Sequence, residues 1–171
     1  MREGASASSV EARPPRAPGA AASRPSLDQR AASSNEIARA LSFDIEEKQI
    51  QLRVTGEPLA IEADEQLFRQ ALFNLVLNAV QAVATQGEIE ICLTKVSATA
   101  ATLEVRDNGP GVPPAEREAI FKPYFTSTQK GTGLGLAVVQ QIVLAHGWEI
   151  ECRANEPKGA CFLLKHLKIV G

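Results

Sequence analysis

Apolar residues recur at helical spacing between residues 65 and 83, and they predict the longest helix of the chain. One row of this helix comprises Leu67, Ala71, Leu75, Ala79 and Val83, and the adjacent row comprises Phe68, Leu72, Val76 and Val80. Two adjacent rows form a broad apolar stripe, which is typical of a helix that packs on a sheet. Asp64 stands just before the first turn and is expected to cap the helix.

Shorter periodic segments predict three further helices. Residues 34–45 carry apolar side chains at four-residue spacing, and residues 136–144 carry a dense apolar run. The second segment ends at His146-Gly147, where glycine suits a helix C-terminus and the partial negative charge of the helix end favours histidine. A proline opens residues 114–121 and favours a short helix there.

Alternation of apolar and polar residues predicts strands in other parts of the chain. The pattern is found at residues 50–54, 59–61, 88–95, 103–105, 149–152 and 160–170. Residues 1–33, by contrast, are rich in Ala, Ser, Pro and Arg and cannot bury enough apolar surface to offset their ordering entropy. We therefore expect a disordered tail or linker over residues 1–33 and one folded domain over residues 34–171.

Two asparagines lie beside the apolar stripe of the long helix. Asn74 and Asn78 are one turn apart, so their side chains share a face. Taken alone, they are compatible with surface asparagines, for which poor helix propensity is a cost. Their carboxamide oxygens also suit Mg²⁺, which keeps several waters and binds nucleotide phosphates at the same time. The glycine motifs further along the chain favour this second interpretation.

A carboxylate followed by two glycines ends the strand predicted at residues 103–105. The segment runs Asp107-Asn-Gly109-Pro-Gly111, and an ordinary Asp-Asn-Gly turn is one explanation for it. It also suits a binding site, because Asp107 can accept a hydrogen bond from an exocyclic amine. Gly109 and Gly111 would let a flat ring approach the backbone.

A glycine-rich loop precedes the helix predicted at residues 136–144. The loop consists of Gly131, Thr132, Gly133, Leu134 and Gly135. Glycines let backbone N–H groups approach an anion, and the N-terminus of the next helix adds a partial positive charge. We therefore predict a phosphate-binding loop, although its spacing fits neither the dinucleotide-binding fingerprint nor the P-loop.

The segment over residues 112–132 is long, contains several Pro and Gly residues and carries aromatic anchors, which is typical of a lid. Lys122 and Lys130 are the lysines that could meet phosphates there. A solvated surface position is an equal alternative for each of them.

Composition and charge narrow the functional classes. A net charge of −2 over 171 residues gives no reason to expect broad binding of nucleic acid or a membrane surface. No apolar run approaches the ~20 residues of a membrane helix and no secretory leader is visible, so we expect a cytoplasmic protein. The three cysteines lack CxxC spacing, which predicts reduced thiols rather than disulfides or a zinc site.

Three motifs thus occur in a fixed order: the Asn74-to-Asn78 helix segment, the Asp107-to-Gly111 segment and the glycine loop at residues 131–136. Together with the aromatic segment at residues 121–125, they resemble the catalytic, ATP-binding domain of bacterial sensor histidine kinases, in the GHKL or Bergerat-fold superfamily. The resemblance covers residues 34–170. It implies an α+β fold, a two-layer α/β sandwich whose mixed, mostly antiparallel sheet carries three main helices on one face.

The resemblance implies a role for each motif. Asn78 would be the magnesium ligand, Asn74 would support Mg²⁺ and the phosphates of ATP, and Lys130 would join them in catalysis. Asp107 would accept a hydrogen bond from the amine of adenine. The other residues implied in the site are Gly109 and Gly111 beside the base, Phe121 and Phe125 as lid anchors, and Gly131, Thr132, Gly133, Leu134 and Gly135 around the phosphates and ribose.

Several positions depart from the family pattern. ATP-hydrolysing relatives carry a glutamate one turn before the magnesium asparagine, and Asn74 at that place cannot act as a base. This difference favours phosphoryl transfer over hydrolysis. Gln81 and Ala82 stand where many kinases have a lysine and an aromatic residue. Ala160 and Cys161 follow Gly159 where a hydroxyl residue is common, and Trp148 stands where a second glycine is common.

The chain has no counterpart of the helical dimerisation domain that carries the phosphoacceptor histidine. Neither His146 nor His166 is followed by an acidic residue, and neither lies in a helix of that kind. The resemblance therefore implies a catalytic module, monomeric by itself, that transfers the γ-phosphoryl group of ATP to a histidine on another domain and serves a response regulator indirectly. Two alternatives stay open: a nucleotide-responsive interaction module without catalysis, and a serine kinase of the anti-sigma-factor type.

Overall fold

The computed structural model of the chain describes residues 35–126 and 131–170. The tail predicted over residues 1–33 and the candidate residue Lys130 lie outside these ranges. The strands are β1 (Gln51–Gly56), β2 (Glu88–Lys95), β3 (Ala100–Asp107), β4 (Glu149–Ala154) and β5 (Ala160–Lys168). The helices are α2 (Ser42–Glu47), α3 (Glu65–Ala82) and α4 (Gly135–Ala145), and residues 35–40 are also helical.

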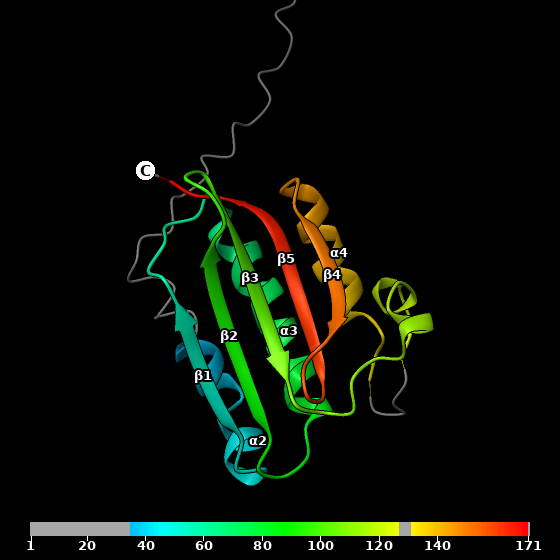
Figure 1. Cartoon of the computed structure of the whole chain (residues 1–171). Helices are drawn as coiled ribbons and strands as arrows, with labels where there is room; N and C mark the ends of the chain where they lie inside the picture. Colours follow the sequence, from blue (N-terminus) through cyan, green and yellow to red (C-terminus); the bar gives the residue numbers. More distant parts are fainter. Residues whose placement is uncertain (1–34, 127–130, 171) are drawn as a thin grey trace, which may run out of the picture.

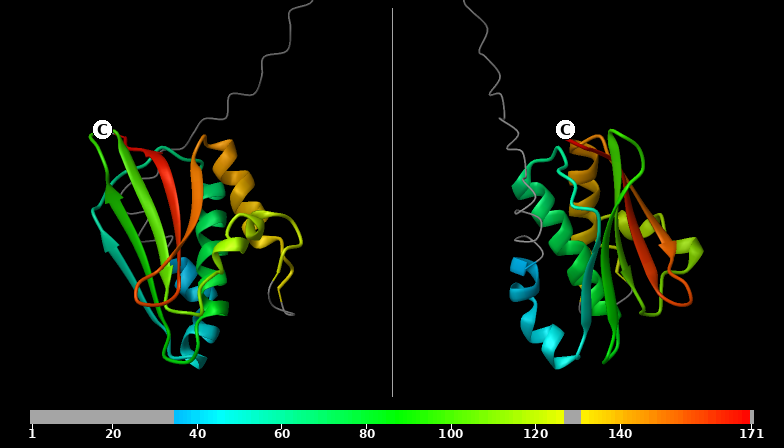
Figure 2. Two further views of the ribbon diagram at one scale, coloured as in Figure 1. Left: turned by 45° about the vertical axis from the view of Figure 1, so that its right-hand side comes forward. Right: turned by 60° about the vertical axis from the view of Figure 1, so that its left-hand side comes forward.

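The five strands form one mixed sheet in the order β1-β2-β3-β5-β4 (Figure 1). β1 and β2 are parallel, whereas the other three neighbouring pairs are antiparallel. The helices α2, α3 and α4 line one face of this sheet in both views of Figure 2. The structure therefore confirms the predicted α+β fold, with two layers and a mostly antiparallel sheet. None of the described helices is long and apolar enough to cross a membrane.

The apolar stripe of α3 packs on the inner face of the sheet, as its two rows of side chains predicted. Leu75 and Val76 in the middle of α3 have no exposed surface, and alternate residues of β2 and β3 are buried in the same core. The alternation of β3 continues to its last residue, so Asp107 also faces inward. Among the described residues, Asp107 is the one charged side chain that is buried.

Polar groups cap both ends of α3. Asp64 is the N-cap, as predicted, and its Oδ1 accepts a hydrogen bond from the Leu67 N–H at 2.9 Å. At the other end, Lys48 Nζ donates hydrogen bonds to the carbonyl oxygens of Val80 and Val83, at 2.8 and 3.1 Å. The last carbonyls of a helix have no partner within the helix. Lys48 therefore closes the C-terminus of α3 from a segment that precedes β1.

The strand predicted at residues 59–61 is absent from the described structure. Ile61 forms a single bridge with Ile169, one residue beyond the end of β5. Backbone hydrogen bonds from Glu62 to Lys168 and from Val170 to Ala60 flank this bridge. The segment therefore pairs only with residues 168–170 at the end of β5 and just beyond it, which is too short a stretch for a ladder.

Two predicted helices are broken in the structure. The helix predicted at residues 114–121 is a pair of 3₁₀ turns, η1 (Pro114–Glu116) and η2 (Ala119–Phe121). Bonds between residues three apart suit such short pieces. The helix predicted at residues 34–45 is interrupted by a turn at Leu41, directly before α2.

We predict that Lys48→Met lowers the free energy of unfolding by about 1–3 kcal/mol, because two carbonyl groups at the end of α3 lose a charged donor. Urea unfolding followed by circular dichroism measures this change. Lys95→Met is the matched control, since Lys95 is exposed at the end of β2. Equal stabilities of the two variants would show that Lys48 contributes nothing to the cap.

Candidate functional site

The three sequence motifs meet around α3. A Cβ atom added to Gly135, the first residue of α4, would lie 3.8 Å from Asn74 Oδ1. The start of α4, which follows the glycine loop, therefore lies beside the middle of α3. A Cβ atom added to Gly109 would lie 2.8 Å from the carbonyl oxygen of Ala82, so the loop after β3 touches the last turn of α3. The structure thus brings together the parts of the site that lie far apart in the sequence.

Asn74 and Asn78 are both half-buried on α3, next to the fully buried Leu75 and Ala79. The burial of their neighbours sets the rotation of the helix, and it turns both carboxamides toward the same side. Neither carboxamide forms a hydrogen bond with another described residue. Their oxygen atoms are therefore available to a cation or to polar groups of a ligand.

Asp107 combines burial with directed hydrogen bonding. Its side chain is 2% exposed, and Oδ1 accepts hydrogen bonds from the backbone N–H groups of Gly109 at 2.8 Å and Ala160 at 3.3 Å. Burial raises the pKa of the Asp107 carboxyl above its usual range, and the two N–H donors offset part of that rise. Both of these bonds reach Oδ1, so Oδ2 keeps its capacity to accept a hydrogen bond from a ligand.

The β4–β5 hairpin supports Asp107 from the other side. Asn155 Nδ2 donates a hydrogen bond to the backbone carbonyl of Asp107 at 2.9 Å. Gly159 has a φ of +114°, and a Cβ atom there would lie only 1.8 Å from the same carbonyl oxygen. Asn155 and the N–H of Ala160 were not predicted as parts of the site. Their partner is about 50 residues away, so no local pattern could indicate them.

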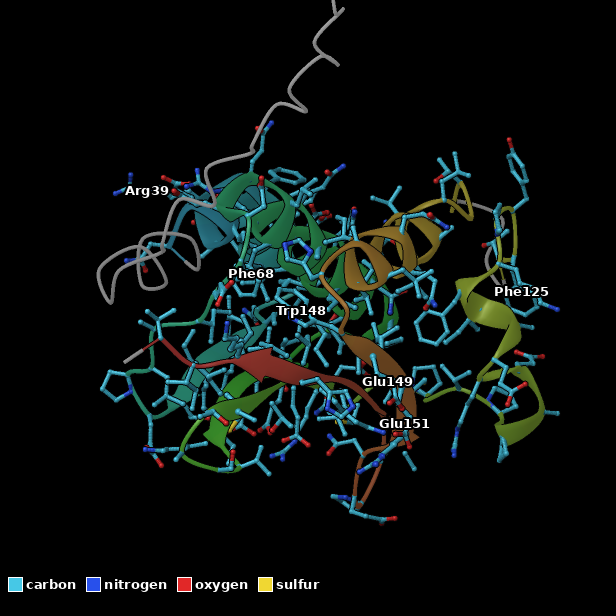
Figure 3. The ribbon with its side chains drawn as sticks, turned by 90° about the horizontal axis from the view of Figure 1, so that it is seen from above. Arg39, Phe68, Phe125, Trp148, Glu149 and Glu151 are labelled. Carbon is cyan, nitrogen blue, oxygen red and sulfur yellow. The ribbon has the colours of Figure 1, made fainter. Side chains whose placement is uncertain are left out.

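The described part of the predicted lid folds against the glycine loop. Phe121 packs edge-on against Phe162 of β5, with ring centroids 6.2 Å apart, and Phe125 packs on the core from beside α4 (Figure 3). The N–H of Tyr124 donates to the carbonyl of Gly133 at 2.8 Å. Gly133 has a φ of +70°, and a Cβ atom there would lie 2.6 Å from the Tyr124 backbone. Glycine is therefore required at this contact.

The glycine loop leaves the start of α4 open. No described side chain caps the helix, and the N–H of Leu134 is held only weakly by Thr132 Oγ1, at 3.4 Å. Gly131 and Gly133 are half-buried, whereas Thr132 and Leu134 are exposed. Uncapped N–H groups and the partial positive charge of the helix suit an anion. A separate cavity of about 220 Å³ adjoins Gly109 on the side of Ala82 and Lys158.

Comparison with known proteins agrees with this geometry. The family described as histidine kinase-, DNA gyrase B-, and HSP90-like ATPase matches residues 63–170. The sensor histidine kinase ZraS of Salmonella typhimurium is 42% identical over 126 residues, which cover 72% of this chain and 27% of ZraS. The chain thus spans about a quarter of the length of the curated relatives it matches.

Solved structures show the same relationship. A structure of the catalytic domain of histidine kinase ThkA matches with a TM-score of 0.74 and 29% identity, over 85% of this chain and 95% of that one. Full-length ShkA in complex with AMPPNP also has a TM-score of 0.74, at 29% identity, over 90% of this chain and 33% of that one. The chain belongs to the family of histidine kinase-, DNA gyrase B- and HSP90-like ATPases, and it is a catalytic domain of the histidine kinase type.

We predict that Asp107→Asn does not destabilise the fold at pH 7. Asparagine keeps an oxygen for the Gly109 and Ala160 N–H groups and removes a desolvated charge. Because the pKa of Asp107 is raised in the folded state, the native protein binds its proton more tightly than the unfolded chain does, and wild-type stability falls as the pH rises through the folded pKa. The advantage of the variant should therefore shrink at acidic pH.

Urea unfolding of both proteins at neutral and acidic pH measures this difference. The difference between variant and wild type cancels the titration of the other carboxylates. A variant less stable than the wild type at pH 7 would show that the fold itself requires the ionised carboxylate.

Proposed function

We propose that this chain binds Mg·ATP between α3, the loop after β3 and the glycine loop, and donates the γ-phosphoryl group to a histidine on a separate domain. The observation that carries this proposal is the convergence of Asn74, Asp107 and the open N-terminus of α4. The similar protein ShkA has been solved in complex with AMPPNP, a nucleotide with a triphosphate chain, which supports a nucleotide in this place.

Asp107 would select the base. Its Oδ2 can accept a hydrogen bond from the exocyclic amine of adenine, whereas the keto group of guanine offers no donor at that position. The N–H of Gly109 donates to the same carboxylate at 2.8 Å, and a side chain at Gly111 would meet the carbonyl of Gly159 at 2.9 Å. These glycines would leave space for a flat ring against the loop.

Asn78 would be the protein ligand of Mg²⁺, and Asn74 would support the ion and the phosphates. The residues present fit this group, because carboxamide oxygens are hard donors and Mg²⁺ is often held by few protein ligands together with phosphate oxygens. The described residues include no cluster of His, Cys, Asp and Glu side chains that could hold a metal by themselves. When bound, Mg²⁺ would neutralise charge on the phosphate oxygens.

The glycine loop would hold the phosphate chain. Backbone N–H groups at the start of α4 are capped by no described side chain and would face the phosphates, with Thr132 and Leu134 at the edge of the site. Lys122 and Lys130 are candidates for contacts with phosphate. Closure of the lid anchored by Phe121 would exclude water during transfer.

The described residues argue for transfer over hydrolysis. Asn74 cannot remove a proton from water. His146 is unsuited as an acceptor because both of its ring nitrogens are engaged in hydrogen bonds. His166 lies on β5 next to Glu149, at 3.4 Å, in a sheet and not in a helix. The acceptor would therefore be a histidine on a dimerisation domain, in cis or in trans.

A two-component pathway would follow from this reaction. A solved structure of ThkA, 28% identical to this chain, holds that kinase in complex with the response regulator TrrA. We propose that this chain likewise serves a response regulator indirectly, through the phosphorylated histidine domain. The module would act in the cytoplasm, as a monomer by itself, without binding nucleic acid or membrane.

We predict that calorimetric titration shows binding of Mg·ADP and of a non-hydrolysable ATP analogue to the wild type. Asp107→Asn should weaken both affinities about 10- to 100-fold, since an amide in place of the carboxylate loses a charged acceptor for the base amine. Asp44→Asn is the control, because Asp44 is exposed on α2. Absence of binding by the folded wild type would refute the nucleotide site.

A second prediction concerns the acceptor. Incubated with labelled Mg·ATP, the chain alone should gain no acid-labile phosphate, whereas a separately supplied dimerisation domain with its histidine should become labelled. Asn78→Ala should reduce labelling at least tenfold, and Gln70→Ala, an exposed change on the same helix, should not. Label on serine would favour a serine kinase, and nucleotide binding without transfer would favour an interaction module.

A further inference from the structure

His146 makes two hydrogen bonds at the C-terminus of α4. Its Nδ1 lies 2.8 Å from the carbonyl oxygen of Ile142, and its Nε2 lies 3.0 Å from the backbone nitrogen of Asp64. A carbonyl oxygen only accepts and a backbone N–H only donates. Nδ1 must therefore carry the proton and Nε2 must be the acceptor, which defines a neutral imidazole in one tautomer.

Aromatic packing holds the same ring in place. The His146 ring stacks on Trp148, with centroids 4.2 Å apart and planes 24° apart. Trp148 is buried and packs edge-on against Phe68 in the first turn of α3, at 6.3 Å (Figure 3). The side chain of His146 is thus fixed by contacts with both helices, in position as well as in hydrogen bonding.

The two helices joined in this way are the two helices of the proposed site. At one end of their contact, His146 after α4 meets Asp64 before α3. At the other end, Gly135 at the start of α4 lies beside Asn74 of α3. About ten residues separate these ends on each helix, a rise of about 15 Å along each axis. The helices therefore run antiparallel in a matched register.

We infer that His146 is a positioning residue, which holds α4 in register with α3 and so sets the N-terminus of α4 against Asn74 and Asn78. Apolar packing between the helices is non-directional and permits small sliding movements. The hydrogen bond to the Asp64 N–H is directional, and it satisfies a group at the start of α3 that lacks a partner within the helix. That His146 positions α4 is inferred from its contacts. The expected effect on ligand binding also rests on the proposed function.

Loss of the His146 contacts would affect binding of the phosphates more than binding of the base. Asp107 and its partners belong to the sheet, the β4–β5 hairpin and the loop after β3, and neither hydrogen bond of His146 reaches these segments. The phosphate-binding groups belong to the two helices that His146 joins. A shift of α4 along α3 would therefore weaken binding of a triphosphate and leave the recognition of the base largely unchanged.

The test compares two ligands in three variants. His146→Phe keeps a ring for stacking and loses both hydrogen bonds, whereas His146→Gln keeps an amide that can donate or accept. We expect His146→Phe to lower the affinity for the Mg²⁺ complex of a non-hydrolysable ATP analogue about tenfold and the affinity for adenosine less than twofold. His146→Gln should recover part of the loss, and the exposed His166→Gln should bind like the wild type. Equal losses for both ligands, or no loss, would overturn the inference.

A measurement without nucleotide separates this inference from the proposed function. In NMR spectra of the nucleotide-free protein, the side-chain amide signals of Asn74 and Asn78 should shift in His146→Phe relative to the wild type. They should stay in place in His166→Gln. The ¹⁵N shifts of the wild-type imidazole should show the proton on Nδ1. Unshifted amides in a folded His146→Phe protein would refute the positioning role, and unfolding of that variant leaves His146→Gln to decide by the same signals. If the wild type binds no nucleotide but these amide signals shift in His146→Phe, the proposed function alone is refuted.

Discussion

The packing of α3 on the inner face of the sheet is the contact on which the rest of this structure depends. Burial of its apolar stripe sets the rotation of the helix, and the rotation decides where Asn74 and Asn78 point. The middle of the same helix lies beside Gly135, and its last turn lies beside Gly109. Both glycine segments therefore pack against this one amphipathic helix. The energy of that packing comes from apolar area and carries little directional information.

Directional contacts that orient α3 are the hydrogen bonds at its two ends. Lys48 closes the C-terminus of the helix, and Asp64 caps its N-terminus while donating its own N–H to His146. Each contact satisfies a backbone group that a helix leaves without a partner. The same contacts tie α3 to the segment before β1 and to α4. These hydrogen bonds therefore fix how α3 lies relative to both segments.

Asp107, unlike these contacts, is a group whose burial is unfavourable for the stability of the free protein. Burying a carboxylate is unfavourable, and the fold offsets only part of that cost with N–H groups from Gly109 and Ala160. Asn155 of the β4–β5 hairpin donates to the backbone carbonyl of Asp107 and not to its carboxylate, so it positions the residue without stabilising the charge. A ligand that donates a hydrogen bond to Oδ2 would relieve the remaining cost. Burial of Asp107 in the free protein would therefore favour the binding of such a ligand.

The periodicity of the chain was sufficient to predict α3, α4 and most strands, because burial of one face imposes a local repeat on the sequence. Motifs with unusual residue types, such as Asp107 with its glycines, were visible for the same local reason. Lys48, His146 and Asn155 were not visible as parts of the architecture. Each of them forms a hydrogen bond to a distant segment, and these bonds span 32 to 82 residues along the chain. Only the tertiary structure decides which backbone groups such side chains meet, because that depends on how helices and hairpin settle on the sheet and not on any neighbouring residue.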